Sequence, residues 1–195
     1  MTDSDIEQWK KRIEVVGKAQ ARYLWILLIV GLFYWALQSS INNGVSQPEI
    51  QIPIIGTNLS SEILFASASS VIFFLIIIIH GAFRAFGTAA KVLKLGSGHI
   101  EAYDLAPNAI DFAAYNPKKD KEFPASLLLL AYPLYLSIFW IEAIILLIDL
   151  ITIDLQIEGK LFFIISGLIL CIFSTIDIFK TYRDRLIKIA TNSIK

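Results

Sequence analysis

The sequence predicts an all-α membrane protein with four transmembrane helices, and three observations lead to this fold class. Of the 195 residues, 56% are hydrophobic and 17% are charged, whereas soluble domains are about 45–50% apolar. Four apolar stretches reach or approach the roughly 20 residues that a helix needs to cross a bilayer. The basic residues alternate between the segments that separate these stretches. A lipid bilayer is therefore the expected environment.

The predicted spans are almost free of charge. They cover residues 23–38, 63–83, 125–148 and 161–179. His80, Glu142 and Asp177 are the clearly ionisable side chains within them. A charged arm precedes the first span, and no cleavage signature of small residues follows it, so we interpret this span as an uncleaved signal-anchor.

The distribution of lysine and arginine predicts the orientation. Sixteen of the 17 basic residues lie in the N-terminal arm, the middle segment or the tail, and only Lys160 lies in the two remaining loops. Basic loops are retained on the cytoplasmic side of a membrane. We therefore expect both termini and the middle segment to be cytoplasmic, in a bacterial inner (plasma) membrane.

These spans divide the chain into five predicted regions. They are a cytosolic amphipathic helix over 1–22; transmembrane helices 1 and 2 over 23–83, with an external loop at 39–62; a cytosolic loop with short helices over 84–124; transmembrane helices 3 and 4 over 125–179, with an external loop at 149–160; and a basic cytosolic tail over 180–195. The amphipathic helix either hinges at Gly17 or runs unbroken into the first span.

Both external loops alternate apolar residues in a way that is typical of strands. Ile50, Ile52 and Ile54 do so in one loop, and Ile151, Ile153, Leu155 and Ile157 in the other. We predict a small two-stranded β-ribbon on the external side. The alternative is that these loops are irregular and enter the membrane interface.

Glu142 is the leading candidate site, because a carboxylate within a span is costly and usually faces a cavity or a partner. Counting residues from the centre of each span places Ser69, Ser70 and Ser166 at a similar depth. We predict an intramembrane polar cluster of these four residues. It serves either to hold the helices together or to carry an ion or a proton.

A second candidate is a pair at the inner interface. His80 and Asp177 lie near the inner ends of their spans, so they either form an ion pair or are separately solvated. His99, Glu101 and Asp104 lack a recognised ligand spacing. We therefore expect no metal site and no cofactor.

Two apolar faces on the cytosolic side predict a protein partner. One is on the N-terminal helix, with Trp9 and Ile13; the other is on a short helix of the middle loop, with Ile110, Phe112 and Tyr115. The formal net charge of zero does not favour a nucleic-acid partner. Phosphate-binding and hydrolase motifs are absent from the sequence, so we predict no catalytic residues and no enzyme.

The function predicted from these features is non-enzymatic. We expect a homo-oligomeric sensor, anchor or effector module that works with a cytosolic protein, in bacterial stress response or antiviral defence. One alternative is an oligomeric ion channel or small transporter that uses Glu142, with Pro133 as a hinge. The other is an assembly factor for a membrane complex.

Overall fold

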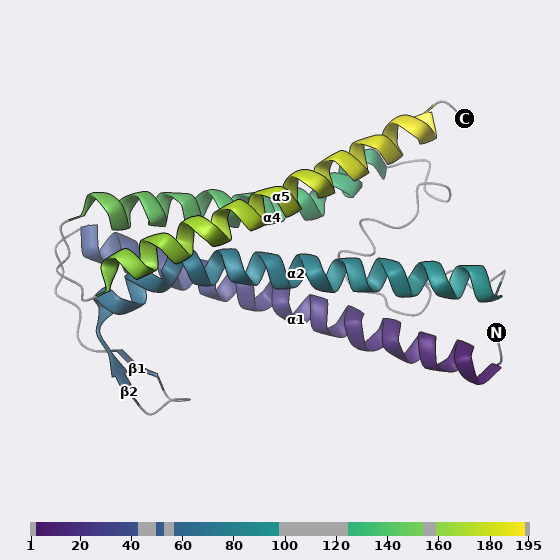
Figure 1. Cartoon of the computed structure of the whole chain (residues 1–195), viewed down its shortest axis with the longest axis horizontal. Helices are drawn as coiled ribbons and strands as arrows, with labels where there is room; N and C mark the ends of the chain where they lie inside the picture. Colours follow the sequence, from purple (N-terminus) through teal and green to yellow (C-terminus); the bar gives the residue numbers. More distant parts are fainter. Residues whose placement is uncertain (1–2, 43–49, 53–56, 98–124, 154–158, 194–195) are drawn as a thin grey trace. The chain divides into compact units, whose positions relative to one another are not determined.

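The computed structural model describes residues 3–42, 50–52, 57–97, 125–153 and 159–193 (Figure 1). Its helices are α1 (Asp3–Asn42), α2 (Ser61–Ser97), α4 (Ala125–Thr152) and α5 (Lys160–Ser193), and its strands are β1 (Ile50–Ile52) and β2 (Thr57–Leu59). The chain divides into two compact units. The first unit comprises 1–25, 77–136 and 177–195, and the second comprises 26–76 and 137–176.

The described part of the chain contains four helices that are long and apolar enough to cross a membrane. These candidate spans are Ser4–Ile41, Ser61–Ala82, Leu134–Thr152 and Lys160–Lys180. They confirm the predicted number of membrane-spanning helices. Their location in a bacterial membrane and the direction in which they cross it stay predictions.

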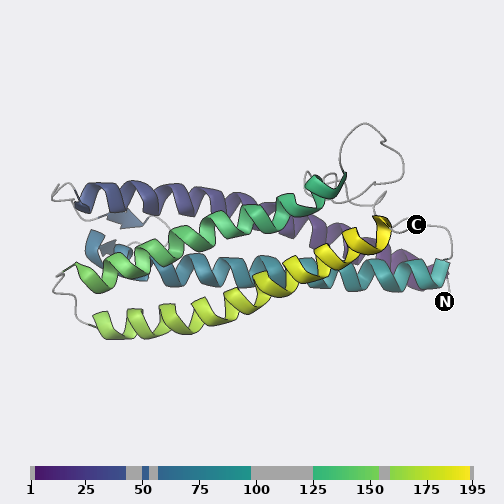
Figure 2. The same ribbon diagram turned by 90° about the horizontal axis from the view of Figure 1, so that it is seen from above.

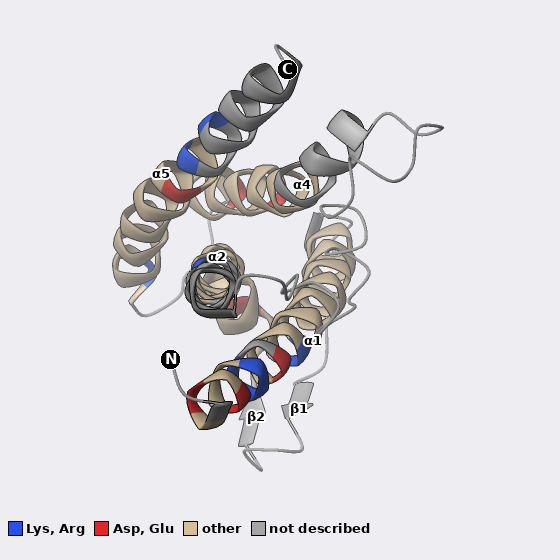
Figure 3. Ribbon diagram, turned by 90° about the vertical axis from the view of Figure 1, so that its right-hand side faces the viewer, with Lys and Arg blue, Asp and Glu red and all other residues tan. Residues whose placement is uncertain are grey.

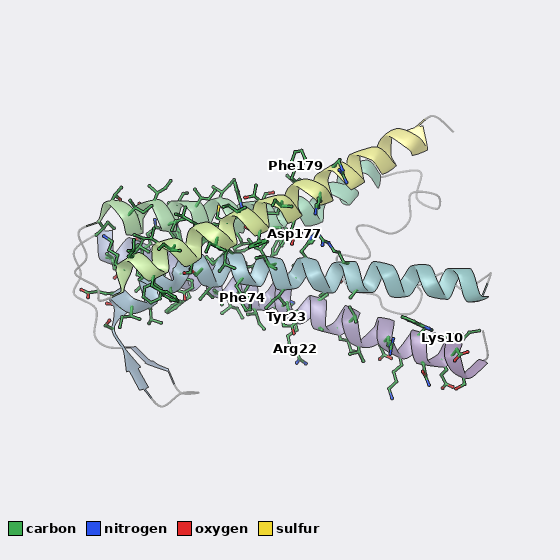
Figure 4. All side chains as sticks on the ribbon, in the orientation of Figure 1. Lys10, Arg22, Tyr23, Phe74, Asp177 and Phe179 are labelled. Carbon is green, nitrogen blue, oxygen red and sulfur yellow. The ribbon has the colours of Figure 1, made fainter. Side chains whose placement is uncertain are left out.

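Helix α1 is continuous over 40 residues and has no break at Gly17. At roughly 1.5 Å per residue it is about 60 Å long, twice the roughly 30 Å of a bilayer core. Its charged side chains lie on its N-terminal half, up to Arg22, and none follows before Asn42. Figure 3 shows this change from coloured to tan along α1, and Figure 4 labels Lys10, Arg22 and Tyr23 on it. The membrane-compatible half of α1 is therefore its C-terminal half.

Local hydrogen bonds account for the start of α2. The Ser60 hydroxyl accepts a hydrogen bond from the Ile63 amide at 3.3 Å, which is how a serine caps a helix N-terminus. Glu62 lies in the first turn, where the helix dipole favours a negative charge. At its other end α2 stops at Ser97, between two glycines.

The β-ribbon differs from the expected one. Strands β1 and β2 are antiparallel and both belong to the first loop, with Ile50 opposite Leu59 and Ile52 opposite Thr57. The expected strand of the second loop does not begin at Ile151, because Ile151 and Thr152 are the last residues of α4. The Thr152 hydroxyl donates to the Ile148 carbonyl at 3.0 Å, one helical turn back. The remainder of that strand lies mostly at 154–158, outside the described residues.

The turn into α5 has a glycine where the backbone requires one. Gly159 has φ of +79°, a conformation that residues with a Cβ rarely adopt. The next residue, Lys160, starts α5 and donates from Nζ to the Ile153 carbonyl at 2.7 Å. This contact joins the two ends of the loop between α4 and α5.

Burial differs strongly among the four spans. In the most apolar window of α2, 56% of the residues are buried, compared with 11% in that of α5. The large exposed apolar residues of α5 are Leu161, Phe162, Ile165, Leu168, Ile169, Ile172, Phe173, Ile176 and Phe179. Helix α2 therefore supplies much of the protein core, whereas α5 presents a surface suited to hydrocarbon.

Candidate functional site

Helices α1 and α4 are held together by contacts that recur at one fixed sequence offset. In the second unit, the Gln38 amide donates to the Asp149 carboxylate, 111 positions away. In the same unit Glu142 lies beside Gly31, and 142 minus 31 is also 111. In the first unit, the Tyr135 hydroxyl donates to the Leu24 carbonyl at 2.8 Å, again across 111 positions.

A constant offset means that the paired segments run in the same direction. In the second unit, the contacts fall at residues 31 and 38 of α1, and at 142 and 149 of α4. Each pair of positions is seven residues apart, or two helical turns, which is the period of helices that pack as left-handed coiled coils. We call these two contacts the α1–α4 seam. Figure 2 draws the ribbons of both helices.

The buried residues of both helices show the same period. On α1 they are Gly17, Gln20, Leu24, Leu27, Gly31, Tyr34 and Leu37, and on α4 they include Leu136, Phe139, Ala143, Leu146 and Leu150. The spacing alternates between three and four almost throughout, as at the core positions of a coiled coil. The polar contacts therefore lie along a regular packing stripe.

Glu142 is held close to the backbone of α1. A Cβ atom at Gly31 would lie 2.4 Å from Phe139 Cε1, 2.7 Å from Phe139 Cδ1 and 3.0 Å from Glu142 Oε2. A glycine is therefore required here, because the ring and the carboxyl occupy the space of a side chain. The other carboxyl oxygen, Oε1, is buried and has no hydrogen-bond partner.

The three predicted serines lie at a contact between α2 and α5. The hydroxyls of Ser70 and Ser166 are 2.9 Å apart. A Cβ at Gly167 would lie 3.0 Å from Ser69 Oγ and 2.9 Å from Leu147 Cδ1. The structure thus brings Ser70 and Ser166 together and puts Ser69 beside Gly167, and the described contact of Glu142 is with α1. A shared function of the four residues stays a prediction.

At the predicted inner pair, Asp177 forms a salt bridge with Arg84. His80 is buried and lies one helical turn before Arg84 on α2. Figure 4 labels Asp177 on α5. The structure therefore gives Asp177 a cationic partner that the sequence analysis did not consider.

Of the predicted partner-binding residues, the structure describes the side chain of Trp9 alone. Trp9 is half-buried, and the guanidinium carbon of Arg12 lies 4.9 Å from its ring centroid, within the range of a cation–π contact. The side chain of Ile13 and all of Ile110, Phe112 and Tyr115 lie outside the described part.

Sequence reasoning missed several residues of the seam. Gly31 and Gln38 complete the contacts of the two carboxylates. Gln20 is fully buried, and neither atom of its side-chain amide has a hydrogen-bond partner. Trp140 Nε1 is also buried without a partner. The available signal was the seven-residue spacing of Tyr135, Glu142 and Asp149, three of the polar residues within an apolar helix.

Within the described residues, no three His, Cys, Asp or Glu side chains are grouped closely enough to hold a metal ion. Four apolar helices of spanning length are what a multi-pass integral membrane protein has. No family model, no curated protein and no solved structure matches this chain.

Proposed function

We propose that this protein is a membrane-anchored helical module that acts on, or through, a soluble protein on the cytosolic side. The observation that carries the proposal is the length of three helices. Helices α1, α2 and α5 have 40, 37 and 34 residues, and a span needs about 20. Each helix has some 15 to 20 residues beyond a single crossing.

The basic residues of α1, α2 and α5 support placing the extra residues of these three helices on the same side of the membrane. The extra residues are the N-terminal half of α1 and the C-terminal ends of α2 and α5. Successive spans alternate in direction, so these three ends belong on one side of a membrane. They also hold most of the basic residues of the chain, which favours the cytoplasmic side.

The N-terminal half of α1 has the features of a helix that is displayed in water. Glu14 and Lys18 form an exposed salt bridge one turn apart, and the ammonium of Lys18 lowers the pKa of Glu14. Val15 is 58% exposed. A rigid, charged helix with occasional exposed apolar residues suits a protein partner, and a homo-oligomer would present several copies of it.

The test is purification of the tagged full-length protein in mild detergent from its own host, with mass spectrometry of proteins recovered at stoichiometric yield. A soluble partner should be recovered, and it should be lost when residues 98–119 are replaced by a flexible linker of equal length. In the control, Gly81→Ala, the partner should stay bound, because nothing lies within 4 Å of a Cβ there. Recovery of a homo-oligomer alone would contradict the proposal.

The second candidate function is an ion path through the membrane that uses Glu142. The unpartnered, buried Oε1 of Glu142 favours it, because an ionisable group within a span usually marks a transported ion or a proton relay. The test is ion flux into vesicles that contain the protein. Loss of flux in Glu142→Gln with intact assembly would support the path, and unchanged flux would contradict it.

A further inference from the structure

Within the second unit, two carboxylates of α4 face α1 on the same stripe. Glu142 contacts Gly31, and Asp149 accepts a hydrogen bond from Gln38. Seven residues of helix separate the two carboxylates by about 10 Å along its axis. Asp149 lies one turn from the end of α4 at Thr152, so it is the carboxylate nearer to the membrane surface.

Among the described residues, the apolar segments of the neighbouring helices contain no cationic side chain that could neutralise Glu142. Helix α1 has no charged residue between Arg22 and its last residue, α2 has none from 63 to 79, and α5 has none from 161 to 176. The titratable residue of α1 nearest to Gly31 in the sequence is Tyr34, whose hydroxyl lies 3.5 Å from that of Ser67. On α4 itself the nearest charge is Asp149, which has the same sign.

These observations favour the neutral form of the carboxyl. Oε1 of Glu142 is buried without a hydrogen-bond partner, and an ionised carboxylate in that position is far more costly than a neutral carboxylic acid. A second carboxylate on the same stripe disfavours ionisation further. The backbone of α1 comes close because residue 31 is a glycine, so the carboxyl lies against main-chain atoms and not against a compensating cation.

We propose that Glu142 is a proton-binding site, and that its proton exchanges with the side of the membrane at which α4 ends, by way of Asp149. In the exchange, a hydronium ion that enters at the Asp149 end of α4 gives a proton to the Glu142 carboxylate. The carboxylate becomes a carboxylic acid, and the hydronium ion becomes water. Charge and atoms balance without any redox partner. The inference rests on the second candidate function, the ion path, and is independent of any soluble partner.

The experiment uses a membrane-soluble carbodiimide, which reacts with a protonated carboxylic acid and leaves an acylurea on it. The full-length protein is labelled in right-side-out and inverted membrane vesicles, and the modified residue is found by peptide mass spectrometry. We expect label on Glu142 and none on that peptide in Glu142→Gln, which keeps the shape of the side chain. Labelling should fall roughly tenfold per pH unit on the alkaline side of the titration.

The two vesicle orientations test the route. Labelling should respond rapidly to external pH only in vesicles that expose the end of α4 to the medium. Asp149→Asn should slow this response at least tenfold and leave the final extent of labelling unchanged. A response that is equally fast in both orientations, or unaffected by Asp149→Asn, would overturn the route.

A second measurement does not depend on whether the carbodiimide can reach Glu142. A protonated Glu142 contributes a carboxylic-acid carbonyl stretch to the infrared spectrum, and this band should be absent from Glu142→Gln. If the band is missing in the wild-type protein at neutral pH, Glu142 is ionised and the proposal is wrong. Failure to recover a soluble partner would not affect either result.

Discussion

In the second unit, the contact between α1 and α4 and the contact between α2 and α5 are built from different chemistry. In the α1–α4 seam, a glycine lies against an aromatic ring and a carboxyl, and an amide holds a second carboxylate one heptad away. The α2–α5 contact has three serine hydroxyls and a glycine. Small and hydroxylated residues are the common means by which membrane helices approach each other. Carboxylates along a helix–helix seam are not a common means of such approach.

The two contacts also differ in register. In the second unit, the α1–α4 offset is 111 at both contacts of the seam. Between α2 and α5 in the same unit, it is 96 at Ser70 and Ser166 but 98 at Ser69 and Gly167. The α2–α5 contacts therefore look like ordinary helix packing, whereas a repeated offset indicates that the α1–α4 seam specifies which residues face each other.

The largest expected effect is that of a side chain at Gly31. Overpacking a well-packed core costs about 1–3 kcal/mol, and a Cβ here would lie 2.4 Å from a ring atom of Phe139. We therefore expect Gly31→Ala to lower the free energy of unfolding by about 2 kcal/mol, even though alanine favours helix by up to about 1 kcal/mol. The measurement is unfolding in mixed detergent micelles with a rising dodecyl sulfate fraction.

The matched control is Gly81→Ala on α2, where a Cβ would have nothing within 4 Å. It should leave stability unchanged or raise it by up to about 1 kcal/mol. If both variants behave alike, the close approach at Gly31 does not exist and the distinction between the two contacts fails.

Replacement by leucine should change the free energy of unfolding in opposite directions at two glutamines of α1, Gln20 and Gln38. Gln20 is buried with an amide that has no partner, whereas the Gln38 amide holds Asp149. A buried unsatisfied polar group costs about 1–3 kcal/mol. We expect Gln20→Leu to stabilise by about 1 kcal/mol, and Gln38→Leu to destabilise by about 1–2 kcal/mol because it leaves Asp149 without its donor. The same unfolding assay checks both, and destabilisation by Gln20→Leu would mean that its amide is satisfied.

The α2–α5 contact should be less sensitive. At Gly167 the clashing atoms are the ends of two flexible side chains, Leu147 Cδ1 and Ser69 Oγ, which can move. We expect Gly167→Ala to cost no more than about 1 kcal/mol, the lower end of the overpacking range. A cost equal to that of Gly31→Ala would show that both contacts are equally tight.

Much of the fold could be predicted from composition. Apolar length alone locates four spans, because no other environment accepts so many unbroken hydrophobic residues. The expected start of a strand at Ile151 was wrong, because alternation over a few residues cannot exclude one further turn of a preceding helix. The rest of that expected strand lies mostly outside the described residues. The two described strands are segments of the same loop, and their pairing needs no contact between distant parts of the sequence.

The site could be predicted in part. Glu142 stands out in the sequence as a carboxylate in an apolar run, but Gly31, the residue that it contacts on α1, does not stand out. Depth along a span places Ser69 and Ser166 level with it, yet depth says nothing about which helices are adjacent. Gly31 has no polar side chain to draw attention, and its role depends on the ring of Phe139 across the seam.

The smallest expected effect is at the salt bridge between Arg84 and Asp177, the described α2–α5 contact of the first unit. The Arg84 side chain is 53% exposed and that of Asp177 is 19% exposed, and exposed pairs contribute about 0.2–1 kcal/mol. A double-mutant cycle with Arg84→Gln and Asp177→Asn should give a coupling energy below about 1 kcal/mol that falls as salt is raised. The Ser70→Ala and Ser166→Ala cycle is the neutral comparison, with an expected coupling near 0.6 kcal/mol that salt does not change. A large, salt-independent coupling at Arg84 and Asp177 would mean that this pair is shielded from water, and α2–α5 would then be as specific a contact as the α1–α4 seam.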